Sequence, residues 1–159
     1  MRSRTANWYE TKIRYDKTME DGLDMKVTEQ YVVDALSFTE AEHTMLEEMS
    51  SYISGEFKVT DIKPARYGEI FFSDASADDR WYKAKVQMIT IDEKTEKEKR
   101  RTVTFLVQAA TLAAAVAHVN EGLGTGMQDY VITSVAETQI MDVFEHQTKL
   151  ADDDKVVEE

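Results

Sequence analysis

Two hydrophobic periodicities divide the N-terminal half of the chain into strands and one helix. Apolar and polar side chains alternate over residues 8–15, which predicts a half-buried strand, and residues 26–35 form a second, β-branched segment. The intervening Glu20-Asp21-Gly22 is typical of a hairpin turn. Apolar residues then recur every three or four positions over 38–53, which predicts an amphipathic helix. Further strands are expected at 57–62 and, after Pro64, at 69–72.

Local signals mark where the helices begin and end. Ser37 followed by Glu40 is a capping box at the start of the first helix, and Gly55 follows its end. Thr111 is the corresponding cap of a second helix, which we expect to run through Val119. Around that helix we predict strands at 80–92, 102–110, 130–135 and 140–144, with a charged hairpin tip at 93–101.

The second half of the chain repeats the pattern of the first. Residues 8–13 align with 81–86 at an offset of 73, and residues 57–62 align with 130–135 at the same offset. We therefore predict an α+β fold of two tandem ββαβ-type repeats related by a pseudo-twofold, each an antiparallel sheet covered by one helix. The repeats span 7–72 and 80–144 and together form one compact domain, 1–144. The alternative is convergent patterning of two similar small folds.

Composition limits the chemistry available to the chain. Its 159 residues include no cysteine, so disulfides, thiolate zinc sites and cysteine nucleophiles are excluded. The basic start of the sequence does not lead into an apolar run, and the longest weakly charged stretch, 102–120, is too polar to cross a bilayer. We expect a cytoplasmic protein with no membrane partner.

The chain is acidic, with a formal net charge of −12. Residues 145–159 hold six acids and two bases, and we expect this segment to be a flexible acidic tail. Removing it leaves a charge of −8, which opposes nonspecific binding of duplex DNA.

The sharpest candidate site lies on the open sheet faces. One helix covers only one face of its sheet, so the other face is left to pack or to bind. Tryptophan beside basic residues on a sheet is typical of surfaces that hold single-stranded nucleic acid or a phosphorylated ligand. The alternative is that the indoles pack between the two repeats while the basic side chains form solvated cross-strand pairs. The candidate ligand-binding residues are Trp8, Lys12, Arg14, Trp81, Lys83 and Lys85.

The remaining motifs do not indicate a metal site or a phosphate-binding loop. His43 and His118 fall at similar places in the two predicted helices, but no metal-ligand spacing surrounds them. Gly122, Gly124 and Gly126 follow a helix, whereas a phosphate-binding loop precedes one. We expect no catalytic residues, no metal and no cofactor, and therefore no enzyme.

Three strings resemble a known domain family: WYETKIRY at 8–15, VTEQYVVDALSFTEAE at 27–42 and SVAETQIMDV at 134–143. The chain resembles an uncharacterised domain-of-unknown-function family encoded by gut anaerobes and by their phages and mobile elements, over roughly residues 7 to 145. The resemblance implies no activity and no site residues. It implies a phage or mobile-element context, and hence the host cytoplasm if the chain is phage-encoded.

We therefore expect a non-enzymatic binding or accessory protein that binds its partner or ligand through the open sheet faces. The partner is a protein, a small phosphorylated ligand or a single strand. The alternative function is a single-stranded nucleic-acid-binding protein that uses the aromatic-basic face. Exposed strand edges are also compatible with a homodimer.

Overall fold

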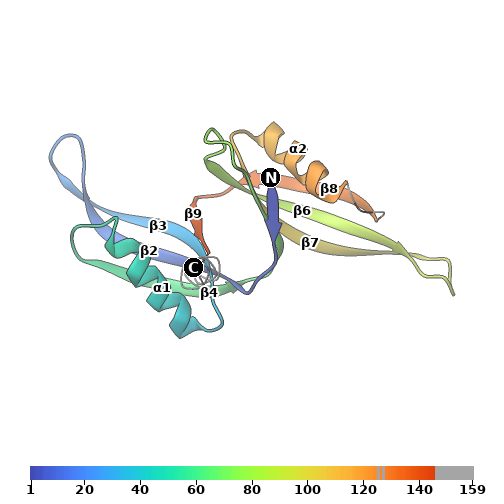
Figure 1. The fold of residues 1–159 in the computed structure, drawn as a ribbon, viewed down its shortest axis with the longest axis horizontal. Helices are drawn as coiled ribbons and strands as arrows, with labels where there is room; N and C mark the ends of the chain where they lie inside the picture. The colour runs from blue at the N-terminus through green and yellow to red at the C-terminus, as the bar shows by residue number, and fades with distance from the viewer. Residues whose placement is uncertain (125, 127, 146–159) are drawn as a thin grey trace, which may run out of the picture. The chain divides into compact units, whose positions relative to one another are not determined.

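The computed structural model describes residues 1–124, 126 and 128–145 and has a mixed α+β fold (Figure 1). The predicted acidic tail lies outside the described residues from residue 146 onward. No described helix is long and apolar enough to cross a membrane. The helices are α1 (Phe38–Ser50) and α2 (Leu112–Leu123), and the strands are β1 (Arg2–Arg4), β2 (Trp8–Thr18), β3 (Asp24–Asp34), β4 (Phe57–Ala65), β5 (Tyr67–Phe72), β6 (Arg80–Ile91), β7 (Glu98–Ala109), β8 (Asp129–Glu137) and β9 (Ile140–Phe144).

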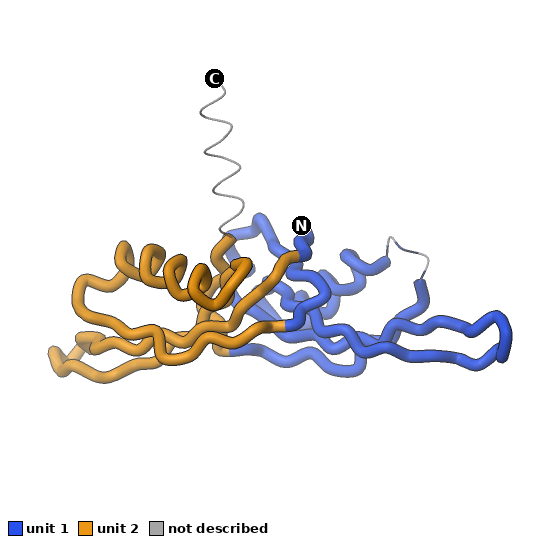
Figure 2. The backbone as a smooth tube through the Cα atoms, turned by 90° about the horizontal axis from the view of Figure 1, so that it is seen from below, with its two compact units in different colours: residues 1–5, 66–138 blue, residues 6–65, 139–159 orange. Residues whose placement is uncertain are grey.

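The chain divides into two compact units, and each takes segments from both halves of the sequence (Figure 2). Of the described residues, those within 1–5 and 66–138 form unit 1, and 6–65 and 139–145 form unit 2. Unit 1 holds a five-stranded sheet in the order β1-β5-β7-β6-β8, and unit 2 a four-stranded sheet in the order β4-β2-β3-β9. Strand β5 pairs in parallel with β7, and β9 pairs in parallel with β3. Both sheets are therefore mixed, not antiparallel as predicted, because each unit receives a parallel strand from the other half of the sequence.

Unit 2 is built on the long β2–β3 hairpin. Gly22 takes φ +82° at its tip, in the left-handed region that glycine enters without strain. Helix α1 covers one face of the sheet and buries Met45 and Met49 against Ile13, Tyr31 and Val33. The rings of Tyr31 and Phe144 stack at 5.4 Å, so β9 contributes directly to this core.

Unit 1 has a corresponding core between α2 and its sheet. Phe71 of β5 stacks on Phe105 of β7 with 5.4 Å between ring centroids. The helix lies so close to this ring that a Cβ atom on Gly122 would stand 2.8 Å from it. Tyr82, Val86 and Val107 complete the apolar layer.

The predicted helix caps are confirmed. The Ser37 hydroxyl accepts a hydrogen bond from the Glu40 amide at 3.1 Å, and the Thr111 hydroxyl accepts one from the Ala114 amide at 3.1 Å. Several predicted boundaries are wrong, and α1 ends at Ser50 rather than at residue 53. Pro64 lies inside β4, which is an edge strand and therefore tolerates the missing N–H, and Gly122 lies inside α2 rather than ending it.

Each sheet carries a bulge in one of its edge strands, β4 and β8. The register of β2 against β4 shifts between Lys12 and Ile13, and that of β6 against β8 shifts between Lys85 and Val86. The extra residues are Thr60 and Thr133, and the hydroxyl of each donates to the carbonyl of the neighbouring lysine at 3.4 and 3.1 Å respectively.

Candidate ligand-binding site

Both tryptophans of the predicted site are buried. Trp8 is 1% exposed and Trp81 is 2% exposed, so neither indole offers a face to a base from solution. Trp81 meets Phe72 edge-on at 5.6 Å between ring centroids, and the Arg2 guanidinium lies 4.1 Å from the centroid of the Phe72 ring. These indoles therefore act as packing residues in the structure.

The four predicted cations differ in their surroundings. Lys12, Arg14 and Lys85 are exposed, whereas Lys83 is half-buried with its Nζ 5.7 Å from the centroid of the Tyr67 ring. Lys12 and Arg14 project from β2 on the face opposite α1, because Ile13 between them is in the core. Trp8, Lys12 and Arg14 belong to unit 2, and their predicted counterparts belong to unit 1.

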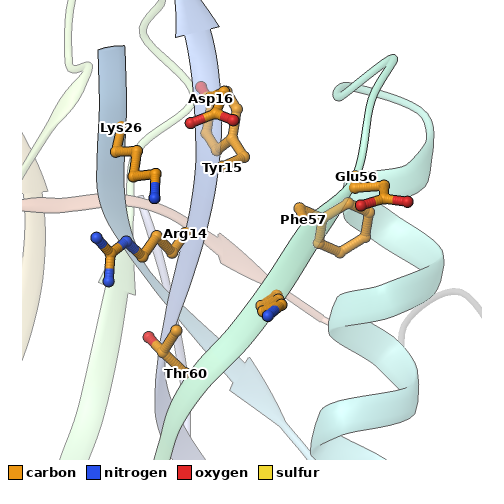
Figure 3. Close-up of a pocket in the computed structure, with 8 residues that line it drawn as sticks. Arg14, Tyr15, Asp16, Lys26, Glu56, Phe57 and Thr60 are labelled. Atoms are coloured by element: carbon orange, nitrogen blue, oxygen red, sulfur yellow. The ribbon is translucent and has the colours of Figure 1, made fainter.

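A hollow of about 290 Å³ lies at the hairpin end of the unit 2 sheet (Figure 3). It is lined by residues of β2, β3 and β4 and by the residue before β4: Arg14, Tyr15, Asp16, Lys26, Glu56, Phe57, Lys58 and Thr60. Among the lining residues, Arg14, Asp16, Lys26 and Lys58 lie on the face opposite α1, whereas Tyr15 and Phe57 pack against the core beneath α1.

Three cations converge on this hollow from three neighbouring strands. Arg14 on β2 lies directly opposite Lys58 on β4, and Lys26 on β3 lies opposite Asp16. Like charges directly across a strand pair repel each other and destabilise the sheet. Among the described residues, no carboxylate lies within 4.0 Å of the charged groups of Arg14, Lys26 or Lys58. The three cations are therefore placed together, and none of them forms an ion pair with a described carboxylate.

Elsewhere on the same face, a carboxylate has a basic partner. Glu10, which is buried, pairs with Lys63 at 3.6 Å and accepts a hydrogen bond from the Gln30 amide at 3.4 Å. Burial and a hydrogen bond to Glu29 raise the pKa of Tyr15, which keeps that phenol neutral beside the hollow. Only Asp16 and Glu56 oppose the three cations in the lining, which leaves a net positive charge.

His43 and His118 do not form a site. His43 pairs with Glu47 at 3.0 Å one turn along α1, and both side chains are exposed. His118 Nδ1 lies 2.9 Å from the Gln108 carbonyl oxygen, and its Nε2 lies 3.9 Å from Asp78, which also accepts a hydrogen bond from the Ser73 hydroxyl. Within the described part of the chain, no group of three or more histidine or carboxylate side chains is placed to hold a metal ion.

Sequence reasoning missed Lys26 and Lys58. Both lie at alternate positions of predicted strands, so their place on the open face could have been read from the strand period. Lys58 lies beside Arg14 only because β4 pairs with β2, and this pairing cannot be predicted from a local sequence pattern.

The chain belongs to a family of domains of unknown function. The family model described as "Domain of unknown function (DUF4494)" matches residues 7–146, which is most of the sequence. Comparison with curated proteins and with solved structures found no match.

Proposed function

We propose that this domain is a non-enzymatic accessory protein that binds a small phosphorylated ligand on the open face of the unit 2 sheet. The main observation that supports this proposal is that Arg14 and Lys58 lie opposite each other on neighbouring strands and, with Lys26, line a hollow of about 290 Å³. Phosphate oxygens are strong acceptors of hydrogen bonds from such cations, and an arginine guanidinium can bind a phosphate in a bidentate manner. A ligand that supplies negative charge would relieve the repulsion that Asp16 and Glu56 compensate only in part.

We also propose that the two units descend from one duplicated ββαβ-type repeat, with the pseudo-twofold that such a duplication implies. Several equivalences support it: Thr60 and Thr133 are both bulge residues, and the β3–β9 register matches the β7–β5 register. Gln30 of β3 pairs with Ile140 of β9, and Thr104 of β7 pairs with Tyr67 of β5. Thr104 is 74 residues after Gln30, and Ile140 is 73 residues after Tyr67, so the two pairs are equivalent under the repeat.

The duplication supplies an internal comparison for the proposed site. The positions of Arg14 and Lys58 correspond to Gln87 and Val131, which are also register partners. Lys26 corresponds to Arg100, whose guanidinium lies 3.4 Å from Glu98 and 3.1 Å from the Gln87 side-chain oxygen. Unit 1 thus carries a neutral pair and a compensated arginine where unit 2 carries three cations. This contrast favours a specialised role for unit 2.

A single-stranded nucleic acid remains the second candidate, because Lys12 and Arg14 form a short basic row along β2. Stacking of bases would normally supply much of the affinity for a single strand. The burial of Trp8 and Trp81 removes the rings that were expected to provide it. A compact phosphorylated ligand therefore fits the surface better than a strand.

The cellular setting is inferred from the family resemblance. We place the protein in the cytoplasm of a cell that carries a phage or mobile element, where a small binding protein can sequester or present a ligand. An acidic chain in this setting is not expected to bind duplex DNA.

Isothermal titration calorimetry at low salt tests the proposal with inorganic pyrophosphate as the probe and with a short oligothymidylate for comparison. We expect pyrophosphate to bind and its affinity to fall as salt rises. The double variant Arg14→Gln/Lys58→Val copies the pair found in unit 1 and should weaken binding by about tenfold or more.

The matched control is Lys94→Gln/Lys97→Gln, which removes the same charge from the turn of the other hairpin. It should leave pyrophosphate affinity nearly unchanged. Equal losses in the two double variants would mean that only net charge matters and would overturn the proposed site. Tighter binding of oligothymidylate than of pyrophosphate would favour the second candidate.

A further inference from the structure

The charges around the hollow of unit 2 are sorted by sign along β2 and β4. Arg14 lies opposite Lys58, and Asp16 and Glu56 follow the end of the strand ladder, two residues nearer the hairpin turn, and line the same hollow. Figure 3 shows Arg14 and Asp16 in succession along β2, with Glu56 at the start of β4. One cross-strand pair of residues therefore separates a cationic pair from an acidic pair.

The cationic and acidic pairs share the open face of the sheet. Side chains two positions apart on a strand point to the same face, so Asp16 lies on the face of Arg14 and Glu56 on the face of Lys58. The aromatic pair between them packs against the core on the other face. A strand rises about 3.3 Å per residue, so the backbone positions of the two charged pairs are about 7 Å apart.

The two carboxylates of the hollow have no partner in the described part of the chain. Neither Asp16 nor Glu56 forms a side-chain hydrogen bond or an ion pair there, although three cations line the same hollow. Like charges set next to each other across a strand pair destabilise the sheet, and exchanging one acid with one base would remove both conflicts. The sorted arrangement therefore does not serve the stability of the sheet.

Unit 1 lacks this sorted arrangement. The positions of Asp16 and Glu56 correspond to Ile89 and Asp129, which are register partners in the unit 1 sheet. A single acid thus stands where unit 2 has two, just as a neutral pair stands where unit 2 has Arg14 and Lys58. Both charged pairs are specific to unit 2, which links them to one role.

We propose that the phosphorylated ligand of this hollow is an aminoalkyl phosphate, whose phosphate binds the three cations and whose ammonium group binds Asp16 and Glu56. This inference rests on the proposed function, because the same cations hold the phosphate. An ammonium group suits two adjacent carboxylates better than a neutral hydroxyl does, because hydrogen bonds between charged groups are about twice as strong as neutral ones. The hollow of about 290 Å³ is at the small end of ligand pockets, which suits a compact ligand of this kind.

A matched pair of ligands tests the ammonium contact. Propyl phosphate and aminopropyl phosphate carry the same phosphate on a chain of the same length and differ in the terminal ammonium group. In isothermal titration calorimetry of the full chain at low salt, aminopropyl phosphate should bind about fivefold more tightly, which is the effect expected of partly exposed ion pairs.

The double variant Asp16→Asn/Glu56→Gln separates the two ends of the ligand. It should bind both alkyl phosphates with equal affinity, and it should bind inorganic pyrophosphate more tightly than the unsubstituted chain, because two repelling carboxylates are gone. The matched control is Glu42→Gln/Glu93→Gln, which removes the same charge from two exposed residues outside the hollow. This control should keep the preference for aminopropyl phosphate.

The outcomes separate this inference from the proposed function. Binding of pyrophosphate without any preference between the two alkyl phosphates would overturn the ammonium contact and leave the phosphate site standing. A preference that survives Asp16→Asn/Glu56→Gln, or that the control also loses, would overturn the ammonium contact as well. Absence of binding for all three phosphates would overturn the proposed function and this inference together.

Discussion

Removing the Phe71 side chain should destabilise unit 1, although Phe71 precedes most of that unit in the sequence. Phe71 is 1% exposed, lies in β5, and stacks on Phe105 beneath α2. In a chain whose sequence halves folded separately, the same residue would belong with β2 and β3. Phe71→Ala therefore tests whether β5 pairs with β7 as the structure has it.

The expected loss of unfolding free energy is large, because Phe71→Ala would leave a cavity in a closely packed core. Truncating a buried phenylalanine to alanine usually costs about 3–5 kcal/mol. A domain of ordinary stability has about 5–15 kcal/mol in total. With a urea dependence of about 2 kcal/mol per molar, the unfolding midpoint should fall by about 2 M. The matched control is Phe38→Ala, which removes a 52% exposed ring and should cost about 1 kcal/mol or less.

The two tryptophans allow each unit to be followed separately. Trp81 reports on unit 1 and Trp8 on unit 2, so Trp8→Phe and Trp81→Phe backgrounds give single-indole chains. Phe71→Ala should shift the urea transition of the Trp81 signal by the full amount. A shift below about 1 kcal/mol, or a shift seen only through Trp8, would refute the assignment of β5 to the unit 1 core.

Three further predictions concern local features. Ser37→Ala removes the cap of α1 and should cost about 1 kcal/mol in urea unfolding, whereas an unchanged midpoint would contradict the cap. Gly122→Ala should destabilise the chain by up to about 2 kcal/mol, because overpacking against Phe71 outweighs the gain in helix propensity; a more stable variant would show that the ring moves aside. The pKa of Asp142 is raised by desolvation and by Glu48, so its contribution to stability is present at acid pH and lost as pH rises through the folded pKa. Asp142→Asn should therefore be slightly stabilising at neutral pH, by well under about 1 kcal/mol, with the difference vanishing below about pH 4; a constant difference across pH would contradict this.

The local elements could be predicted because their signals are local. The hairpin at Gly22 and the caps at Ser37 and Thr111 depend on residues within a few positions of one another. The return strand β7 begins at Glu98, earlier than predicted, because its charged residues 98–101 remain paired with the uncharged residues 88–91 of β6. Strand β1 was missed because three residues carry no readable period.

The parallel strands and the buried tryptophans could not be predicted in the same way. Pairing of β5 with β7 and of β9 with β3 brings together residues more than thirty positions apart, and the alternation of apolar residues is the same whichever sheet a strand joins. Trp8 and Trp81 were assigned to open faces because one helix covers only one side of a sheet. Their burial depends on long-range packing, which the strand period does not encode.

The candidate site was predicted in part. Lys12 and Arg14 lie on the exposed open face of unit 2 as expected, while Lys83 packs on Tyr67. The residues that give the hollow its charge, Lys26 and Lys58, become visible only once the strand order β4-β2-β3 is known.

The most direct test of the binding proposal is a ¹H–¹⁵N correlation titration of the full chain with inorganic pyrophosphate at low salt. We predict that shifts concentrate at residues 14–16, 26 and 56–60 and include the Arg14 side-chain Nε–H. The Gln87–Val131 region of unit 1 should remain unchanged. Shifts confined to the 92–101 hairpin, or no shifts at all, would contradict a phosphate-binding surface on the open face of unit 2.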